Sequence, residues 1–309
     1  MSEIKLFQIS GQNAIELKSE SVGLEKSLQT LIENNLETIL GIEFIKSEHS
    51  TGKAHGGRID TLGIDENGCP VIIEYKRTIN ENVINQGLFY LDWLLDHKAE
   101  FEMLLLKKHG GLELDEIDWS APRLVCIAGD FTKYDVHAVR QINRNIDLIR
   151  YSRFTKDFLA LELVNRTSMI TSGLAPSPGQ NNTHTAEVIA STPHKPIDEK
   201  IAKMTQSAKD TYESLRTFLL ALGDDVEEKQ LKLYMAYRRI KNFVCIVVHG
   251  NKMLVYLKIN PDTVRLEAGF TKDVRNKGHW GTGDLEITIN NIDDLRRAEP
   301  LLLRSYEEA

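Results

Sequence analysis

The stretch Gly57–Arg77 reads GRIDTLGIDENGCPVIIEYKR and decides the fold expected for the chain around it. Arg58–Asp65 and Pro70–Arg77 have the composition of strands, and the intervening Glu66-Asn67-Gly68 is a strong hairpin signal. Val71-Ile72-Ile73 is continuously apolar, which indicates a central strand rather than an exposed edge. The sequence therefore predicts an antiparallel hairpin inside a larger sheet.

Three charged residues of this hairpin point to chemistry. Asp60 lies on the first strand, and Glu74 and Lys76 lie on the second. Because strand side chains alternate, Glu74 and Lys76 emerge on one face, about 6–7 Å apart. Two carboxylates beside a lysine suit Mg²⁺ or Mn²⁺, and the lysine could orient or help deprotonate an attacking water. The alternative is a solvated edge strand that carries Glu74 and Lys76, with Asp60 in a loop.

The flanking sequence predicts an α/β unit built on a mixed sheet flanked by helices. Arg123–Ala128 is an apolar run typical of a strand buried on both faces. The other expected elements are helix Gly23–Leu40 ended by Gly41, strand Ile42–Ser47, helix Asn82–His97 with helix resuming through Lys108, helix Tyr134–Asn143, and strands Ile146–Tyr151 and Phe158–Val164.

Asp60, thirteen intervening residues and then Glu74-Tyr75-Lys76 resemble the active-site signature of the PD-(D/E)XK nuclease superfamily. The text Gly57–Arg77 is similar to the nuclease domain of the mismatch-specific endonucleases of archaea and actinobacteria, and the resemblance covers roughly residues 22–160. It implies a restriction-endonuclease-like fold, a metal held by Asp60 and Glu74, and Lys76 as the residue that positions the water. Ile59 replaces the proline of the family's name, a departure that leaves this chemistry intact.

Two flanking helices extend the resemblance. Glu25-Lys-Ser-Leu-Gln29 resembles the helix whose glutamate completes the metal site, and Gln86-Gly-Leu-Phe-Tyr90 resembles the Q-xxx-Y element of RecB-like nucleases. Gln86 and Tyr90 are one helical turn apart and can face one cleft. The alternatives are a solvated Glu25, ordinary packing for Gln86 and Tyr90, and an Arg58 that pairs with Asp60 or Asp65 instead of a phosphate.

The implied function is a metal-dependent DNA endonuclease that uses Mg²⁺ or Mn²⁺, in repair, restriction or phage defence. In the related mismatch endonucleases this domain stands at the C-terminus, whereas here it comes first, so their substrate cannot simply be carried over. The alternatives are an RNA-directed nuclease and a non-catalytic module that binds nucleic acid or an effector on a nuclease frame.

The net charge of the 309 residues is −7, and residues 198–309 contain equal numbers of acidic and basic residues. The excess of acidic residues therefore lies in the N-terminal part, and any nucleic-acid binding needs local basic patches. One expected patch gathers Arg140 and Arg144, one helical turn apart, with Arg150 and Arg153. A solvated helix face is the alternative.

The composition divides the chain into residues 1–167, a linker at 168–197 rich in Pro, Ser, Thr and Asn, and an α+β accessory domain at 198–309. In the last part, the text LYMAYRRIKNFVCIVVHGNKMLVYLKINP (residues 233–261) and the later Gly278-His-Trp-Gly-Thr-Gly-Asp284 resemble a bacterial domain family of unassigned role that is often appended to such nucleases. Its Arg238, Arg239 and Lys241 stand among aromatic residues, which suits nucleic-acid contact or, equally, a packed aromatic core. Its expected elements are helices Ser207–Leu222 and Asp293–Tyr306 and strands Phe243–Val248, Met253–Lys258, Arg265–Phe270 and Glu286–Ile289.

Apolar runs are too short for a membrane span, and the N-terminus has no apolar signal region. The three cysteines lack the spacing of a zinc site or a disulfide framework. We expect a cytoplasmic protein, with binding or homodimerisation as the role of the accessory domain.

Overall fold

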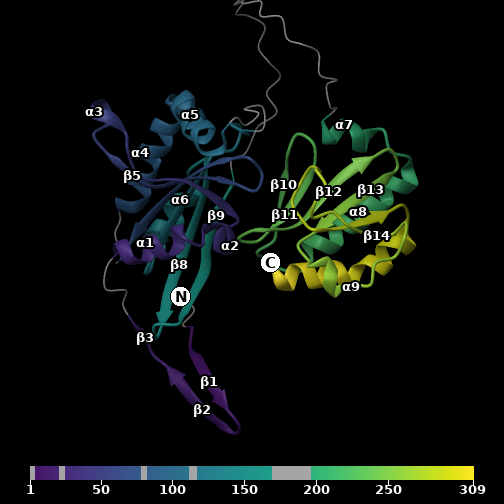
Figure 1. Ribbon diagram of the computed structural model, residues 1–309, viewed down its shortest axis with the longest axis horizontal. Coiled ribbons are helices and arrows are strands. Elements are labelled where there is room, and N and C mark those ends of the chain that lie inside the picture. The colour runs from purple at the N-terminus through teal and green to yellow at the C-terminus, as the bar shows by residue number, and fades with distance from the viewer. Residues whose placement is uncertain (1–3, 21–24, 78–81, 111–116, 169–195) are drawn as a thin grey trace, which may run out of the picture. The chain divides into compact units, whose positions relative to one another are not determined.

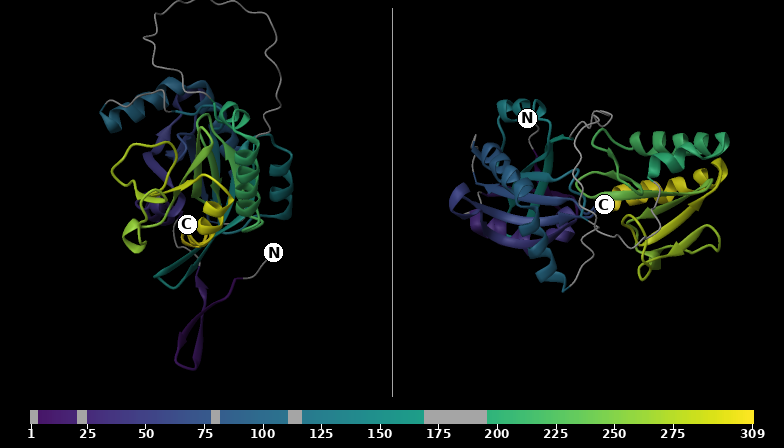
Figure 2. Two further views of the ribbon diagram at one scale, coloured as in Figure 1. Left: turned by 90° about the vertical axis from the view of Figure 1, so that its right-hand side faces the viewer. Right: turned by 90° about the horizontal axis from the view of Figure 1, so that it is seen from above.

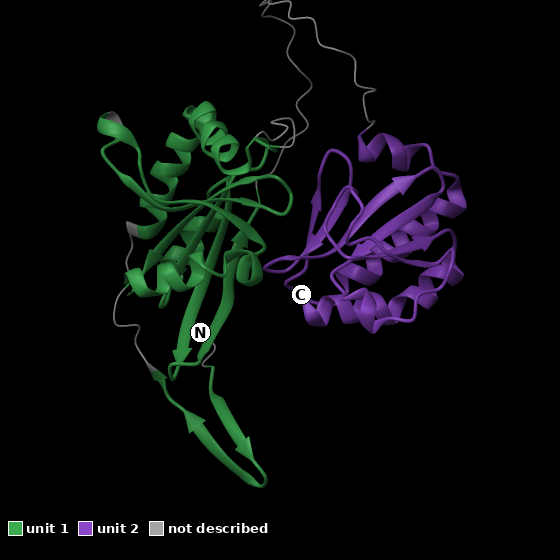
Figure 3. Cartoon of the chain, viewed as in Figure 1, with its two compact units in different colours: residues 1–172 green, residues 173–309 purple. Residues whose placement is uncertain are grey.

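The computed structural model describes residues 4–20, 25–77, 82–110, 117–168 and 196–309. The chain forms two compact units, residues 1–172 and 173–309 (Figure 3). The expected linker at 168–197 lies almost entirely outside the described residues. Among the helices described, none is long and apolar enough to cross a membrane.

Unit 1 is built on a seven-stranded mixed sheet of order β3-β8-β7-β6-β5-β4, with β9 paired to β8. Pairing is parallel between β6 and β7 and between β7 and β8, and antiparallel elsewhere. Helices lie on both faces of the sheet, which confirms the predicted fold class (Figures 1 and 2). The strands are β3 (Ser19–Glu20), β4 (Ile42–Ser50), β5 (Arg58–Asp65), β6 (Pro70–Lys76), β7 (Arg123–Ala128), β8 (Asn145–Phe154) and β9 (Phe158–Thr167).

One face of this sheet carries a core in which Leu91, Phe101 and Val139, from three helices, pack with Ile72 and Leu124 of the strands. The helices of unit 1 are α1 (Glu25–Glu33), α2 (Leu36–Leu40), α3 (Gly52–His55), α4 (Asn82–Asp96), α5 (Lys98–His109) and α6 (Lys133–Arg140). A separate hairpin of β1 (Leu6–Ser10) and β2 (Asn13–Leu17) precedes them.

The expected β5–β6 hairpin is confirmed, and its turn shows why it forms. The Asp65 carboxylate accepts hydrogen bonds from the backbone N–H groups of Asn67 (2.9 Å) and Cys69 (3.0 Å). Gly68 adopts φ 76°, a conformation that glycine tolerates without strain. Aspartate and glycine in these places therefore fix the register in which Ile64 faces Pro70.

The single helix expected over Gly23–Leu40 is wrong, because the structure divides this stretch into α1 and α2. The Asn35 side chain donates to the carbonyl of Leu31 at 2.8 Å and so satisfies a carbonyl at the end of α1. Asparagine competes with helical hydrogen bonding in this way, which explains the break.

Unit 2 is a six-stranded antiparallel sheet of order β10-β11-β12-β13-β15-β14. The helices α8 and α9 cover one face, where Leu215 and Leu302 pack with Phe243 and Ile287. Its elements are α7 (Ile197–Ala202), α8 (Gln206–Leu220), β10 (Glu227–Gln230), β11 (Met235–Arg238), β12 (Asn242–His249), β13 (Lys252–Leu257), β14 (Thr271–Asp273), β15 (Leu285–Ile289) and α9 (Ile292–Glu308).

The strand expected at Arg265–Phe270 is wrong. The backbone N–H groups of Phe270 and Thr271 both donate to the carbonyl of Glu267, which makes a turn at the end of this segment. The edge strand β14 begins only at Thr271 and pairs with β15.

Gly63 provides a test of the packing between β4 and β5. A Cβ atom at this position would lie 2.4 Å from Ile42 Cγ2 and 2.8 Å from the backbone oxygen of Glu43. The backbone oxygen cannot move as a flexible side chain can, so Gly63→Ala should lower the unfolding free energy of unit 1 by about 1–3 kcal/mol.

The measurement is urea unfolding of the Trp280→Phe protein, in which fluorescence comes from Trp93 and Trp119 of unit 1. The control is Gly278→Ala, since a Cβ there would meet no atom within 4 Å. Equal unfolding midpoints for the two variants would contradict the close packing at Gly63.

Candidate active site

Asp60 and Glu74 face each other where β5 and β6 stop pairing. The backbone ladder ends at the pair Thr61 and Ile73. Beyond it the Asp60 N–H donates to Glu74 Oε1 at 3.1 Å, and the Tyr75 N–H donates to Asp60 Oδ2 at 3.1 Å. Each carboxylate thus accepts a backbone hydrogen bond from the opposite strand, which brings the two predicted acidic residues together.

Burial makes this pair electrostatically unusual. Glu74 is 0% exposed, and its Oε2 has no hydrogen-bond partner among the residues that the structure describes. Burial raises the pKa of Glu74 to about 9, with a further contribution from the nearby Asp60 charge. Burial also raises the pKa of Asp60, which the hydrogen bond from Tyr75 partly offsets. The positive charge of Lys76 lowers the pKa of both carboxyls, but by less than burial raises it.

A divalent cation fits this pair. An unsatisfied buried carboxylate oxygen beside a second carboxylate is the donor set that hard cations prefer, with water in the remaining positions. Across the described part of the chain, no group of three or more His, Cys, Asp or Glu residues is arranged to hold a metal ion. The carboxylates that the described geometry brings together are those of Asp60 and Glu74, and the predicted part of Glu25 in the metal site stays a prediction.

Glu25 begins α1 and reaches the end of β6. Its Oε1 lies 3.5 Å from Lys76 Nζ, and its Oε2 accepts from the backbone N–H of Arg77 at 3.2 Å. The structure thus places Glu25 on the lysine of the predicted site. In this arrangement its carboxylate holds Lys76, whose side chain is 21% exposed, at the end of the strand.

Gln29 is a positioning residue that the sequence analysis did not single out. It is 3% exposed, and its amide donates to the Asp60 carbonyl at 2.8 Å and to Glu33 Oε1 at 2.9 Å. Glu33 in turn accepts from the Thr61 hydroxyl at 2.6 Å. A glutamine on the buried side of an amphipathic helix, next to Leu28, was the signal available in the sequence.

Gln86 and Tyr90 meet as their spacing predicts. The Gln86 amide donates to the Tyr90 hydroxyl at 3.1 Å, and this oxygen also accepts from the backbone N–H of Arg58 at 3.1 Å. Tyr90 packs so closely on Gly57 that a Cβ there would lie 2.5 Å from the ring. The pair therefore anchors the start of β5, two residues before Asp60.

Arg58 pairs with neither Asp60 nor Asp65. Its Nε lies 2.5 Å from Glu48 Oε2, and Lys26 Nζ lies 2.6 Å from Glu48 Oε1. The hydrogen bond from Lys26 lowers the pKa of the Glu48 carboxyl. The backbone of Glu48 has φ 53°, which is uncommon for a residue other than glycine. These contacts join three different elements, so no local pattern in the sequence predicts that Glu48 binds Lys26 and Arg58.

The four arginines of the expected basic patch in unit 1 differ in exposure and in partners. Arg140 and Arg144 are exposed; Arg140 donates to Asn165 Oδ1 at 3.2 Å, and Arg144 to the carbonyl of Asn143 at 3.3 Å. Arg150 instead donates to Glu162 and Asp130. Arg153 is half-buried and donates to the carbonyl of Lys156 at 3.2 Å. The exposed cations of the patch are therefore Arg140 and Arg144.

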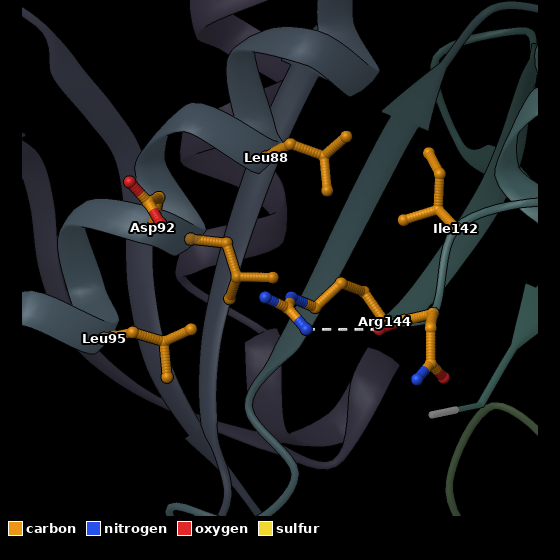
Figure 4. Close-up of a pocket in the computed structure, with 7 residues that line it drawn as sticks. Leu88, Asp92, Leu95, Ile142 and Arg144 are labelled. Carbon is orange, nitrogen blue, oxygen red and sulfur yellow. Dashed lines mark hydrogen bonds between the residues drawn. The ribbon is translucent and has the colours of Figure 1, made fainter. Parts of the chain in front are cut away.

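Arg144 also borders a pocket of about 370 Å³ between α4 and the segment that follows α6 (Figure 4). None of Asp60, Glu74 and Lys76 lines it, so this pocket is separate from the carboxylate pair. The lining residues are Leu88, Leu91, Asp92, Leu95, Ile142, Asn143 and Arg144.

In unit 2 the expected basic cluster is largely engaged within the unit. Arg238 is 3% exposed and pairs with Glu227 at 2.7 Å, while Arg239 pairs with Asp225 at 2.7 Å and lies over the Tyr306 ring. Lys241 is half-buried in the turn before β12, where its carbonyl accepts from the Arg239 N–H. This arrangement matches the packing alternative for the cluster.

Comparison with known proteins identifies relatives for both units. Residues 197–309 match a protein family described as a domain of unknown function, DUF5655. Over 307 residues the chain is 28% identical to an uncharacterized protein of Haemophilus influenzae, covering 99% of this chain and 100% of that protein. The first match agrees with the expectation of a domain without an assigned role.

Two solved structures align with a TM-score of 0.28. One is an EndoMS–dsDNA2 complex, at 20% identity over 42% of this chain and 47% of that chain. The other is a repair endonuclease from Pyrococcus abyssi, at 19% identity over 44% of this chain and 50% of that chain. The alignments thus span about half of each solved chain.

Proposed function

We propose that unit 1 is a metal-dependent endonuclease that hydrolyses phosphodiester bonds of DNA. The observation that carries the proposal is the fully buried Glu74, whose Oε2 has no hydrogen-bond partner in the described part of the chain. Its Oε1 accepts from the Asp60 N–H where the pairing of β5 and β6 ends. When it ionises, this carboxylate is buried with an unpartnered oxygen, and a bound cation would compensate its charge. Lys76 is two residues away on the same strand.

Asp60 and Glu74 would hold Mg²⁺ or Mn²⁺, which when bound supplies Lewis-acid stabilisation of charge on the phosphate. Lys76 orients the attacking water and offsets negative charge on the phosphate. Glu25 restrains the lysine, because its carboxylate lies 3.5 Å from Lys76 Nζ. Gln29 fixes the Asp60 main chain by its hydrogen bond of 2.8 Å to the Asp60 carbonyl.

DNA as the substrate rests on the sequence resemblance around Asp60, Glu74 and Lys76. The test is incubation of the full chain with duplex, single-stranded, flapped and mismatched DNA and with RNA, in Mg²⁺, Mn²⁺ or EDTA. We expect cleavage of a DNA substrate with either metal and none in EDTA. Cleavage of RNA alone would change the substrate, and cleavage that persists in EDTA would overturn the metal-dependent mechanism.

Arg140 and Arg144 are proposed to contact the nucleic-acid backbone, because both are exposed within an acidic unit. Replacing each by alanine should reduce the slope of log affinity against log salt by about 0.7–0.9 for every phosphate that the side chain neutralises. The measurement is fluorescence anisotropy of labelled DNA in EDTA across a salt series. Lys272→Ala in unit 2 is the control, and an unchanged slope for the double variant would exclude the two arginines from binding.

A further inference from the structure

Aromatic rings form a continuous row beside the candidate site. Phe89 and Trp93 lie four residues apart on α4, and His97 follows directly after this helix, four residues beyond Trp93. The ring of His55, on α3, contacts those of Phe89 and His97. The His55 ring centre is 5.3 Å from that of Phe89 and 5.5 Å from that of His97, and Trp93 stacks on His97 at 4.8 Å. α3 and α4 stand at the same end of unit 1 (Figure 1).

The two ends of the row differ in exposure. Trp93 is 1% exposed and belongs to the core, so it supports the row from inside. Phe89 is 46% exposed although it is a large apolar ring in an acidic unit. The Phe89 end of the row is therefore an aromatic surface open to solvent, and the ring of His55 packs against it.

The loop that carries His55 is closed by backbone hydrogen bonds. Thr51 N–H donates to the Gly57 carbonyl at 3.0 Å, and Gly57 N–H donates to the Thr51 hydroxyl at 2.9 Å. Gly56 ends α3 with φ 63° and donates to the Gly52 carbonyl at 2.9 Å. His55 is thus held in place before any ligand arrives, which lowers the entropy cost of binding.

The exposed ring lies close to the proposed chemistry. The Phe89 ring centre is 6.0 Å from that of Tyr90, whose hydroxyl accepts from Arg58 N–H at 3.1 Å. Asp60 follows Arg58 by two strand residues, roughly 6–7 Å further along β5. Two exposed cations belong to the segments that contact this row. Arg58 is 67% exposed and pairs with Glu48, and Lys53, two residues before His55, is exposed with no acidic partner among the described residues.

We propose that Phe89, supported by His55, is a stacking platform for an unpaired nucleobase next to the phosphate that is cut. A ring face stacks on any base, and flanking cations hold the backbone, which is how proteins bind single strands without reading sequence. A base inside a duplex cannot present its face in this way. The inference rests on the proposed nuclease function and assigns to it substrates with unpaired bases at the cut.

The test measures binding in EDTA, so that cleavage plays no part. The probes are a single-stranded DNA oligomer containing 2-aminopurine and a fully paired duplex of the same sequence. Phe89→Ala should weaken single-strand binding about 5- to 150-fold while duplex binding stays within about twofold. Phe89→Trp should retain the binding and the fluorescence quenching that reports stacking.

Phe158→Ala is the matched control, because Phe158 is 53% exposed in the same unit but belongs to β9. It should leave both affinities unchanged, and the thermal unfolding midpoint checks that each variant is folded. Single-strand binding by folded Phe89→Ala equal to that of the unchanged protein would overturn the platform. Cleavage in Mg²⁺ is scored separately: its absence, with the Phe89 effect intact, removes the nuclease function but leaves the binding site.

Discussion

Replacing Glu74 with glutamine should abolish cleavage of nucleic acid, with a loss of at least about 10³-fold. The amide keeps the size of the side chain but cannot ionise and so cannot serve as an anionic ligand. Metal ions contribute several kcal/mol of transition-state stabilisation, and each 1.36 kcal/mol corresponds to tenfold in rate. The measurement is the single-turnover rate on the best DNA substrate in Mg²⁺.

The control is Glu286→Gln, which removes a carboxylate that is also buried but belongs to unit 2. It should leave the cleavage rate within about twofold. Asp60→Asn should lose activity as Glu74→Gln does, and binding of DNA in EDTA should persist in both variants. Full activity of purified Glu74→Gln would rule out the proposed mechanism.

The metal-free protein should lose stability as the pH rises between about 5 and 9, and Glu74 is the main cause. The pKa of its carboxyl is about 9 in the folded chain against an ordinary value of 4.5. In this window the folded chain keeps a proton that the unfolded chain has released, so the unfolding free energy falls with pH. The fall contributed by one group approaches about 1.4 kcal/mol per pH unit.

Urea unfolding of the Trp280→Phe protein in EDTA measures this dependence. Glu74→Gln should flatten it, because the amide has no proton to lose. The raised pKa of Asp60 acts in the same direction, so Asp60→Asn should flatten it further. Equal pH slopes for Trp280→Phe alone and for Trp280→Phe with Glu74→Gln would mean that Glu74 is not held protonated in the metal-free fold.

The strands that frame the site were predictable because their signals are local. The Asp65-to-Gly68 turn and the apolar run Val71–Ile73 specify the β5–β6 hairpin within a few residues. The N-terminal hairpin of β1 and β2 was not predicted. Its signals are weak because its strands are five residues each and almost wholly exposed, although Gly11 marks the turn with φ 62°.

Within the candidate site, spacing predicted the residues that meet along one element. Gln86 and Tyr90 meet because four residues make one helical turn. The contacts of Glu48 with Lys26 and Arg58 were not predictable, because three elements distant in sequence bring them together. The burial of Arg238 was missed for another reason: its partner Glu227 lies opposite it on β10, a strand that was not predicted.

A substitution at Lys76 should separate metal binding from cleavage. Lys76→Met removes the ammonium that orients the water but leaves both carboxylates, so the variant should bind metal and fail to cleave. Its loss of activity without loss of metal would distinguish the role of the lysine from that of the acidic pair.

The central claim is that the buried carboxylates of Asp60 and Glu74 form a divalent-cation site. Its most direct test is calorimetric titration of Mn²⁺ into the EDTA-stripped and desalted full chain and into Glu74→Gln. We predict one saturable site in the unchanged protein, with tighter binding at higher pH because binding releases protons from the carboxyl groups, and no binding at that site in the variant. The same Mn²⁺ affinity and stoichiometry in both proteins would contradict the claim.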